Sequence, residues 1–275
     1  MKLNLKNKIA ILSSLTLLVT IFLILILTYR RTSELTTNDA TQTAIESAQG
    51  SASVLKNRLD HYMGQASAFA SIITSTKASV NPASLSREDL RAQTKSLLIG
   101  LPEALGVYVI FEPNAFDGND AKYAGTFGHD IFGRLNIYWT RDGDGSLSLE
   151  AEPDTCLNNM EDGAYYYGSK ISKSEYLTRA YTYTLDGKDI LMASFVAPIL
   201  VKNEFIGAVG VDVGVDFLQT EIELASQEHG NVSYNFFTAG GMILASTTRK
   251  ELITKDISEL GTDISNLFQE AKGTK

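Results

Sequence analysis

The sequence has 275 residues, a net charge of -8 and 44% hydrophobic residues, a composition typical of a folded chain with one or two domains. The first 31 residues hold five Lys and Arg and no acid, so the remainder carries 19 Lys and Arg against 32 Asp and Glu. Such an acidic remainder lacks the clustered cations that contact phosphates, which argues against nucleic acid as a partner.

An uncharged, almost wholly apolar segment extends from Ile9 to Tyr29. About 20 such residues span the hydrocarbon core of a membrane as a helix. The segment is followed by arginines and by no small-residue cleavage site, which favours an uncleaved anchor over a cleaved signal peptide. Basic residues are slightly in excess before the span, so we predict residues 1–8 in the cytoplasm, residues 9–29 across the membrane and the acidic remainder outside.

A long helix is predicted for residues 32–78, which contain no proline and have apolar residues at helical spacing in their second half. We expect this helix to act as a packing and signalling spine that ends near Pro82. Ser86 and Asp89 then have the spacing of a capping box that opens a second helix.

Three strands are predicted where β-branched and aromatic residues gather, at 106–111, 190–200 and 204–215. The pair Lys202-Asn203 between the last two suits a hairpin turn. The long polar and aromatic stretch 112–181 is interpreted as short strands and loops that cover one face of a sheet.

A second, smaller α/β unit is predicted after these strands. Residues 217–226 have the pattern of a helix and residues 232–245 that of a hairpin. This unit ends before a sheet could be completed, so we expect the chain to be a fragment of a longer protein.

Catalytic and cofactor motifs give no match. Cys156 is the single cysteine and stands in no recognisable nucleophile context. A calcium loop starting at Asp142 would need glycine at its sixth position and an acid at its twelfth, and has neither; a hairpin turn is the better interpretation. Gly207–Gly214 lacks the dinucleotide-binding spacing. We therefore expect no enzyme and no cofactor, an anchored extracytoplasmic hydrolase being the alternative from a different class.

Aromatic residues, among them the only tryptophan, Trp139, are interspersed with acids in the second half of the chain. Aromatic faces and carboxylates together hold ammonium groups, although aromatic clusters also form ordinary cores. Asp212 is more specific, because it lies mid-strand between Val211 and Val213, where an unpaired charge is expensive. A bound amine, a buried arginine or a helix cap could satisfy it.

Several of these motifs occur together in one order. They are Glu112-Pro113-Asn114-Ala115-Phe116-Asp117-Gly118, Gly133-Arg134, Tyr138-Trp139, Ala180-Tyr181, Leu191-Met192-Ala193-Ser194, Pro198-Ile199 and Gly207-Ala208-Val209-Gly210-Val211-Asp212-Val213. The set resembles the double Cache sensor domain of methyl-accepting chemotaxis receptors, over about residues 32–275.

The resemblance implies an α+β fold: a transmembrane helix, a long extracytoplasmic helix and two stacked PAS-like (Cache) modules with antiparallel sheets. Residues 80–217 would form the membrane-distal, ligand-binding module, and residues 218–275 an incomplete proximal one. It further implies an inner-membrane chemotaxis receptor that acts as a homodimer, with its sensor outside the cytoplasm and a cytoplasmic signalling domain absent from this chain.

For the site, the resemblance implies that Asp212 binds a ligand amino group. We predict that a quaternary amine or polyamine enters an aromatic cage in which Asp212 pairs the ligand charge. A second acid, Glu112 or Asp117, assists Asp212. The aromatic residues of the cage are Tyr138, Trp139, Tyr166 and Tyr181. Amino-acid-binding members grip the ligand carboxylate with an arginine close to a tryptophan, whereas four residues separate Arg134 from Trp139 here. The alternatives are therefore an L-amino-acid sensor and the input domain of a histidine kinase or cyclase.

Overall fold

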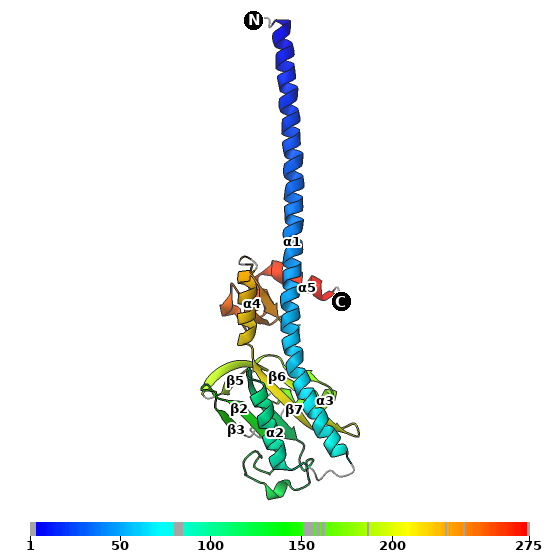
Figure 1. The fold of residues 1–275 in the computed structure, drawn as a ribbon, viewed down its shortest axis with the longest axis vertical. Helices are drawn as coiled ribbons and strands as arrows, with labels where there is room; N and C mark the ends of the chain where they lie inside the picture. Colours follow the sequence, from blue (N-terminus) through cyan, green and yellow to red (C-terminus); the bar gives the residue numbers. More distant parts are fainter. Residues whose placement is uncertain are drawn as a thin grey trace. The chain divides into compact units, whose positions relative to one another are not determined.

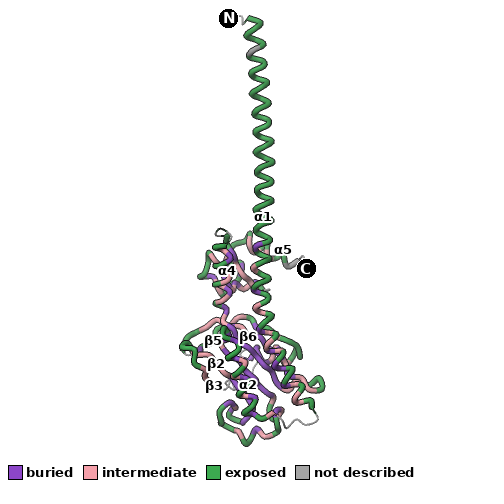
Figure 2. Tube along the Cα trace, viewed as in Figure 1, coloured by how far each residue is buried: buried purple, intermediate pink, exposed green. Residues whose placement is uncertain are grey.

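The computed structural model describes residues 4–79, 85–150, 157, 160, 163–185, 187–228, 230, 232–238 and 240–273. It divides into two compact units, Met1–Ala52 and Ser53–Lys275. The first unit consists of the N-terminal part of helix α1 (Leu5–Ala78), whose most apolar 18-residue window has a mean hydropathy of 2.8 and is not buried at all. Figure 2 shows this part of α1 as exposed along nearly its whole length. The helix is long and apolar enough to cross a membrane, as the sequence predicted.

Two helices begin the second unit. The C-terminal part of α1 continues to Ala78, and the predicted end at Pro82 lies outside the described residues. Helix α2 (Arg87–Gly100) opens with the predicted capping box, in which the Ser86 hydroxyl accepts from the Asp89 backbone N–H and the Asp89 carboxylate accepts from the Ser86 backbone N–H.

A seven-stranded antiparallel sheet occupies the middle of the second unit (Figure 1). Its order is β3-β2-β1-β7-β6-β4, with β5 paired to β6. The strands are β1 (Ala104–Phe111), β2 (Asn136–Arg141), β3 (Leu147–Glu150), β4 (Tyr176–Leu177), β5 (Tyr181–Leu185), β6 (Lys188–Val201) and β7 (Glu204–Gly214). The predicted turn between β6 and β7 is confirmed, because Lys202 and Asn203 have φ of 52° and 66°, as the two-residue turns of twisted hairpins require.

The two faces of this sheet have different partners. Successive strand residues point to opposite faces. Odd-numbered residues of β1, such as Val107 and Val109, pack with α1 and α2 in the main core. Even-numbered residues, such as Tyr108 and Ile110, face helix α3 (Ala164–Ser172) in a second, tyrosine-rich cluster. Figure 2 shows that these strands are largely buried.

The stretch 112–181 is organised differently from the expectation. Strands β2 and β3 extend the sheet beside β1 instead of covering it, and they are joined by the predicted turn at Asp142–Gly145. The cover is helix α3, which was not predicted because its Tyr165-Tyr166-Tyr167 run favours strands by propensity. Burial of these rings against the sheet overrides that local preference.

A smaller assembly follows β7. It contains α4 (Asp216–Glu228), the hairpin β8 (Asn235–Phe237) and β9 (Ile243–Ser246), the short 3₁₀ turns η3 (Lys250–Leu252) and η4 (Ile257–Leu260), and α5 (Thr262–Gly273). The helix and hairpin that the sequence predicted here are confirmed, and α4 packs on β9 in a third apolar cluster. The fold is therefore α+β, with a long N-terminal helix and antiparallel sheets.

Candidate ligand-binding site

Asp212 lies inside the sheet on β7 and is 2% exposed. Its neighbours across the ladder are Gly106 on β1 and Ser194 on β6. The Ser194 hydroxyl donates to Asp212 Oδ1 at 2.6 Å, and the Tyr138 hydroxyl also donates to this carboxylate. Burial raises the pKa of Asp212 to about 6, against the opposing effect of these two hydrogen bonds. Within the described part of the chain, Asp212 forms no ion pair.

A short chain of hydroxyl groups supports this carboxylate. Because Ser194 gives its only proton to Asp212, the Tyr181 hydroxyl donates to Ser194 Oγ, at 2.8 Å. The Ser194 backbone N–H donates to Thr178 Oγ1, also at 2.8 Å. Residues from β2, β5, β6 and β7 are thus joined in one network around a buried acid. Two predicted site residues, Tyr138 and Tyr181, belong to it.

Glycines opposite this network let tyrosine rings lie against the sheet. A Cβ at Gly106 would come within 2.6 Å of the Tyr138 ring, and one at Gly210 within 1.9 Å of Cζ of Tyr108. The Tyr108 and Tyr138 rings meet edge to face with centroids 6.1 Å apart, and Tyr183 meets Tyr138 similarly at 6.3 Å. The face around Asp212 is therefore lined by tyrosines, whose ring faces attract cations.

Trp139 does not belong to this face. Its position beside Tyr138 in β2 points it to the opposite side of the sheet, where its Nε1–H donates to the Arg91 carbonyl at 3.0 Å. Lys95 of α2 lies 4.6 Å from its ring centroid. The prediction that Tyr138 and Trp139 share one cage is thus corrected: Trp139 packs under α2.

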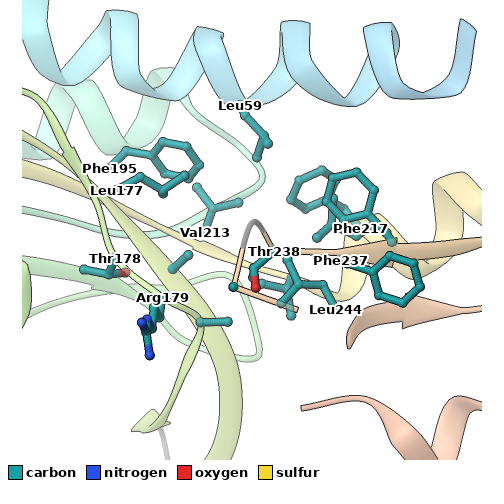
Figure 3. A pocket seen from close by; sticks show the side chains of 16 residues that line it. Leu59, Leu177, Thr178, Arg179, Phe195, Val213, Phe217, Phe237, Thr238 and Leu244 are labelled. Carbon is teal, nitrogen blue, oxygen red and sulfur yellow. The ribbon is translucent and has the colours of Figure 1, made fainter. Parts of the chain in front are cut away.

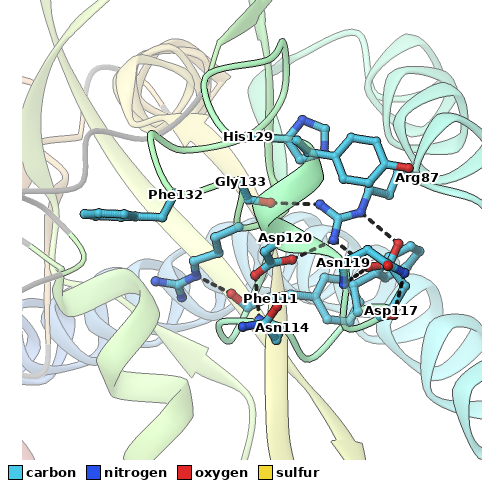
Figure 4. Close-up of polar contacts among 12 residues, drawn as sticks. Arg87, Phe111, Asn114, Asp117, Asn119, Asp120, His129, Phe132 and Gly133 are labelled. Atoms are coloured by element: carbon cyan, nitrogen blue, oxygen red, sulfur yellow. Dashed lines mark hydrogen bonds and ion pairs between the residues drawn. The ribbon is translucent and has the colours of Figure 1, made fainter.

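Asp117 is also placed elsewhere. It accepts from Arg87 of α2, at 3.0 Å from Nε and 2.6 Å from Nη2, and Asp120 accepts from the same Nη2 at 2.6 Å (Figure 4). Arg87 Nη1 donates to the Gly133 carbonyl at 2.8 Å, and the Arg87 guanidinium holds the pKa of Asp117 below its usual range. The network fixes the loop between β1 and β2. Asp117 therefore has a structural partner, and its predicted role beside Asp212 is corrected.

Three further predicted residues gather at the other end of β1. Glu112 accepts from the Tyr166 hydroxyl and from Lys170 Nζ, and Arg134 Nη2 lies 3.9 Å from the same carboxylate. Burial raises the pKa of Tyr166. Asp212 pairs with Gly106, six residues before Glu112, so the Cα atoms of Asp212 and Glu112 are roughly 20 Å apart at the usual strand rise. Glu112 and Arg134 thus lie together at the far end of β1 from Asp212, whereas the Tyr166 ring packs in the same tyrosine-rich cluster as Tyr138.

Ser194 and Thr178 were not among the predicted site residues. Ser194 did carry a signal, since it is a polar residue within the apolar strand β6. Thr178 lies just after the two-residue strand β4, and no local pattern marks it.

Comparisons with known proteins relate the chain to a family of sensor domains. Residues 90–220 match the family model for the first PDC sensor domain of methyl-accepting chemotaxis protein-like proteins. Over 184 residues the chain is 28% identical to methyl-accepting chemotaxis protein TlpQ of Pseudomonas aeruginosa. This match covers 63% of this chain and 26% of TlpQ. The matched region is thus about a quarter of that relative. The matched domains are sensors and not enzymes, as the sequence predicted.

Solved structures share the fold. The extracellular domain of mmHK1S-Z2, assigned as a histidine kinase, has a TM-score of 0.69 and 26% identity over 85% of this chain and 83% of that chain. The periplasmic sensory domain of Campylobacter jejuni chemoreceptor Tlp1 has a TM-score of 0.56 and 15% identity over 82% of this chain and 79% of that chain, a likeness of fold alone. Residues 90–220, just under half of the chain, therefore match the PDC sensor domain of methyl-accepting chemotaxis protein-like proteins, in agreement with the resemblance to double Cache sensors.

Proposed function

We propose that this chain is the extracytoplasmic sensing region of an inner-membrane chemotaxis receptor, and that it binds a small amine at Asp212. The observation that carries the proposal is a carboxylate that is 2% exposed and has only hydroxyl partners within the described residues. Burying a carboxylate without a cation is expensive. A positively charged ligand would supply the missing partner.

The surroundings of Asp212 support a cation over an anion. Hydroxyl groups of Ser194 and Tyr138 hold the carboxylate in place, and tyrosine rings lie around it. An ammonium group at Asp212 gains charge pairing and cation–π attraction together. Arg134, the expected clamp for an amino-acid carboxylate, lies with Glu112 at the far end of β1. This separation favours amines without a carboxylate, such as polyamines and quaternary amines, over L-amino acids.

The organisation of the receptor is part of the same proposal. Residues 80–217 would form the membrane-distal ligand-binding module and residues 218–275 part of a proximal one, anchored by the span at 9–29. The family match and TlpQ support a chemotaxis output, whereas the likeness to mmHK1S-Z2 favours a histidine kinase as the second candidate. Expression of the complete gene product and assay of receptor methylation against autophosphorylation would decide between them.

Closure of loops around the bound ligand would shift the position of the long helix α1. Two copies of α1 in a homodimer would carry this shift to the signalling domain. The polar part of α1 between residues 32 and 46 is exposed, which leaves it open to a second copy. Single cysteines placed there in a Cys156→Ser background should cross-link two chains. Absence of any cross-linked dimer in nanodiscs would reject the dimer.

A thermal-shift screen of the full 275-residue chain in nanodiscs tests the ligand class. The panel comprises putrescine, spermidine, choline, L-alanine, L-arginine and acetate. A ligand that binds the native state alone stabilises it by about 2.7 kcal/mol at a hundredfold excess over its Kd. We expect stabilisation by at least one of the amines and none by acetate.

Variants make this screen specific. Asp212→Asn should remove the shift, whereas Asp189→Asn, an exposed acid on the same sheet that accepts from Thr184, should keep it. Stabilisation by the amino acids alone would overturn the amine assignment in favour of the amino-acid sensor. No shift with any compound, in wild-type protein that melts cooperatively, would reject direct sensing of these ligand classes.

A further inference from the structure

An apolar cavity lies on the opposite side of β6 from Ser194, at the junction of the large sheet with α4 and the β8–β9 hairpin (Figure 3). Its volume is about 510 Å³, within the range of small-molecule sites in proteins. Side chains from five parts of the fold line it: Leu59 of α1, Phe195 of β6, Val213 of β7, Phe217 of α4, and Phe237 and Leu244 of the hairpin. None of these residues takes part in the network at Asp212.

Small residues in the lining leave the space open. Ala180 and Ala193 contribute only methyl groups, and Gly240 contributes no side chain. The walls cannot simply close on this space, because β6 and β7 are held by a regular antiparallel ladder from Met192↔Gly214 to Ile199↔Gly207. An apolar cavity of this kind loses dispersion contacts along its whole lining when nothing fills it.

The polar groups of the lining indicate what could fill it. Thr178 Oγ1 already accepts from the Ser194 N–H, and Thr238 Oγ1 accepts from the Met242 N–H. Arg179 is exposed and lies at the edge of the side chains drawn in Figure 3. A peptide would bring main-chain donors and acceptors that find few partners here, whereas a molecule with few polar groups leaves nothing unsatisfied.

We propose that this cavity is a second ligand site, for a small, neutral, apolar molecule of aromatic or branched aliphatic character. It is separate from the Asp212 carboxylate, although the lining residue Thr178 also accepts from the Ser194 backbone N–H of the network there. Val213 and Phe217 line it and flank the link from β7 to α4, immediately after Asp212 in the chain. A molecule bound here contacts the segment that connects the sensing sheet to the smaller assembly.

Titration with 5-fluoroindole, followed by ¹⁹F NMR on the full chain in nanodiscs, tests this site, with empty nanodiscs subtracted to remove partition into lipid. Ala193→Phe fills the cavity, and Leu244→Ala removes wall contacts on its other side. Ala121→Phe makes the same change as the first variant at an exposed residue of η2 (Asp120–Lys122) and is the matched control.

We expect saturable binding to wild type and to Ala121→Phe with a Kd below about 1 mM, a modest affinity suited to so small a ligand. The Kd should rise about tenfold or more in Ala193→Phe and severalfold in Leu244→Ala, because each changes the apolar contact area. Asp212→Asn should bind as wild type does. Absence of saturable binding to folded wild type, or one shared Kd for wild type, Ala193→Phe and Leu244→Ala, would overturn the proposal.

Discussion

Replacing Asp212 with asparagine should stabilise the ligand-free protein while abolishing amine binding. Burial raises the pKa of this carboxyl from 3.8 to about 6. A rise of that size corresponds to roughly 3 kcal/mol of preference for the neutral form. Asparagine has nearly the same shape and no charge, so Asp212→Asn should be more stable than wild type at pH 8, by at most about 3 kcal/mol. Its amide N–H groups lack assured acceptors, which reduces the gain.

The pH dependence gives this prediction its sign. Because the folded-state pKa of Asp212 lies above the unfolded value, folded protein binds more protons than unfolded protein between the two values. The contribution of Asp212 to wild-type stability therefore falls as the pH rises from about 4 to about 6 and is constant above that. The difference between variant and wild type should be large at pH 8 and small at pH 4.

Thermal unfolding of the full chain in nanodiscs measures this difference. Each kcal/mol shifts Tm by roughly 2–4 °C in a domain of this size, so the variant should melt up to about 10 °C higher at pH 8. Asp189→Asn, on an exposed acid, should match wild type at both pH values. An Asp212→Asn variant that is no more stable than wild type at pH 8 would refute the claim that the buried charge lacks a counter-ion.

Three other substitutions and one control follow from the packing. Trp139→Phe should keep the amine affinity in calorimetric titration, because the ring lies under α2 and away from Asp212. It should lower the stability by about 1–2 kcal/mol, because the hydrogen bond from Nε1 to the Arg91 carbonyl is lost. A loss of amine affinity would show that Trp139 belongs to the binding site. Arg87→Ala should lower the free energy of unfolding in denaturant by roughly 3–5 kcal/mol, since it leaves two carboxylates without their cation. The control Arg91→Ala breaks only the more exposed ion pair with Glu88 and should change the free energy of unfolding by less than about 1 kcal/mol. Equal losses in the two variants would contradict this reasoning. Gly210→Ala should lower the stability by about 1–3 kcal/mol, seen as a lower Tm, because its Cβ would overlap the Tyr108 ring. An unchanged Tm would show that the ring moves aside.

Local patterns predicted the elements whose cause is local. The capping box at Ser86 and the two-residue turn at Lys202-Asn203 depend on residues a few positions apart, and the structure contains both. Asp212 was singled out because a charge in the middle of an apolar strand needs a partner, which holds wherever the strand lies. Period-two alternation could also have separated Trp139 from Tyr138, since neighbouring strand residues face opposite sides.

The remainder of the site depends on contacts that a sequence does not display. A regular hairpin through Lys202-Asn203 would pair Asp212 with Ala193. An irregularity between Ile199 and Leu200 shifts the register by one residue and brings Ser194 opposite Asp212 instead. Likewise, Asp117 is paired by Arg87, an arginine 30 positions earlier in the chain. Such partners are set by tertiary packing.

Calorimetric titration of wild-type protein and Asp212→Asn with putrescine, spermidine and choline, at pH 7.5 and pH 5.0, tests the central claim most directly. We predict that at least one amine binds wild type at pH 7.5 with one site per chain, that none binds Asp212→Asn, and that wild-type affinity falls about tenfold at pH 5.0 as the proton competes for the carboxylate. Equal binding by the variant, or wild-type affinity that is the same at both pH values, would contradict the account.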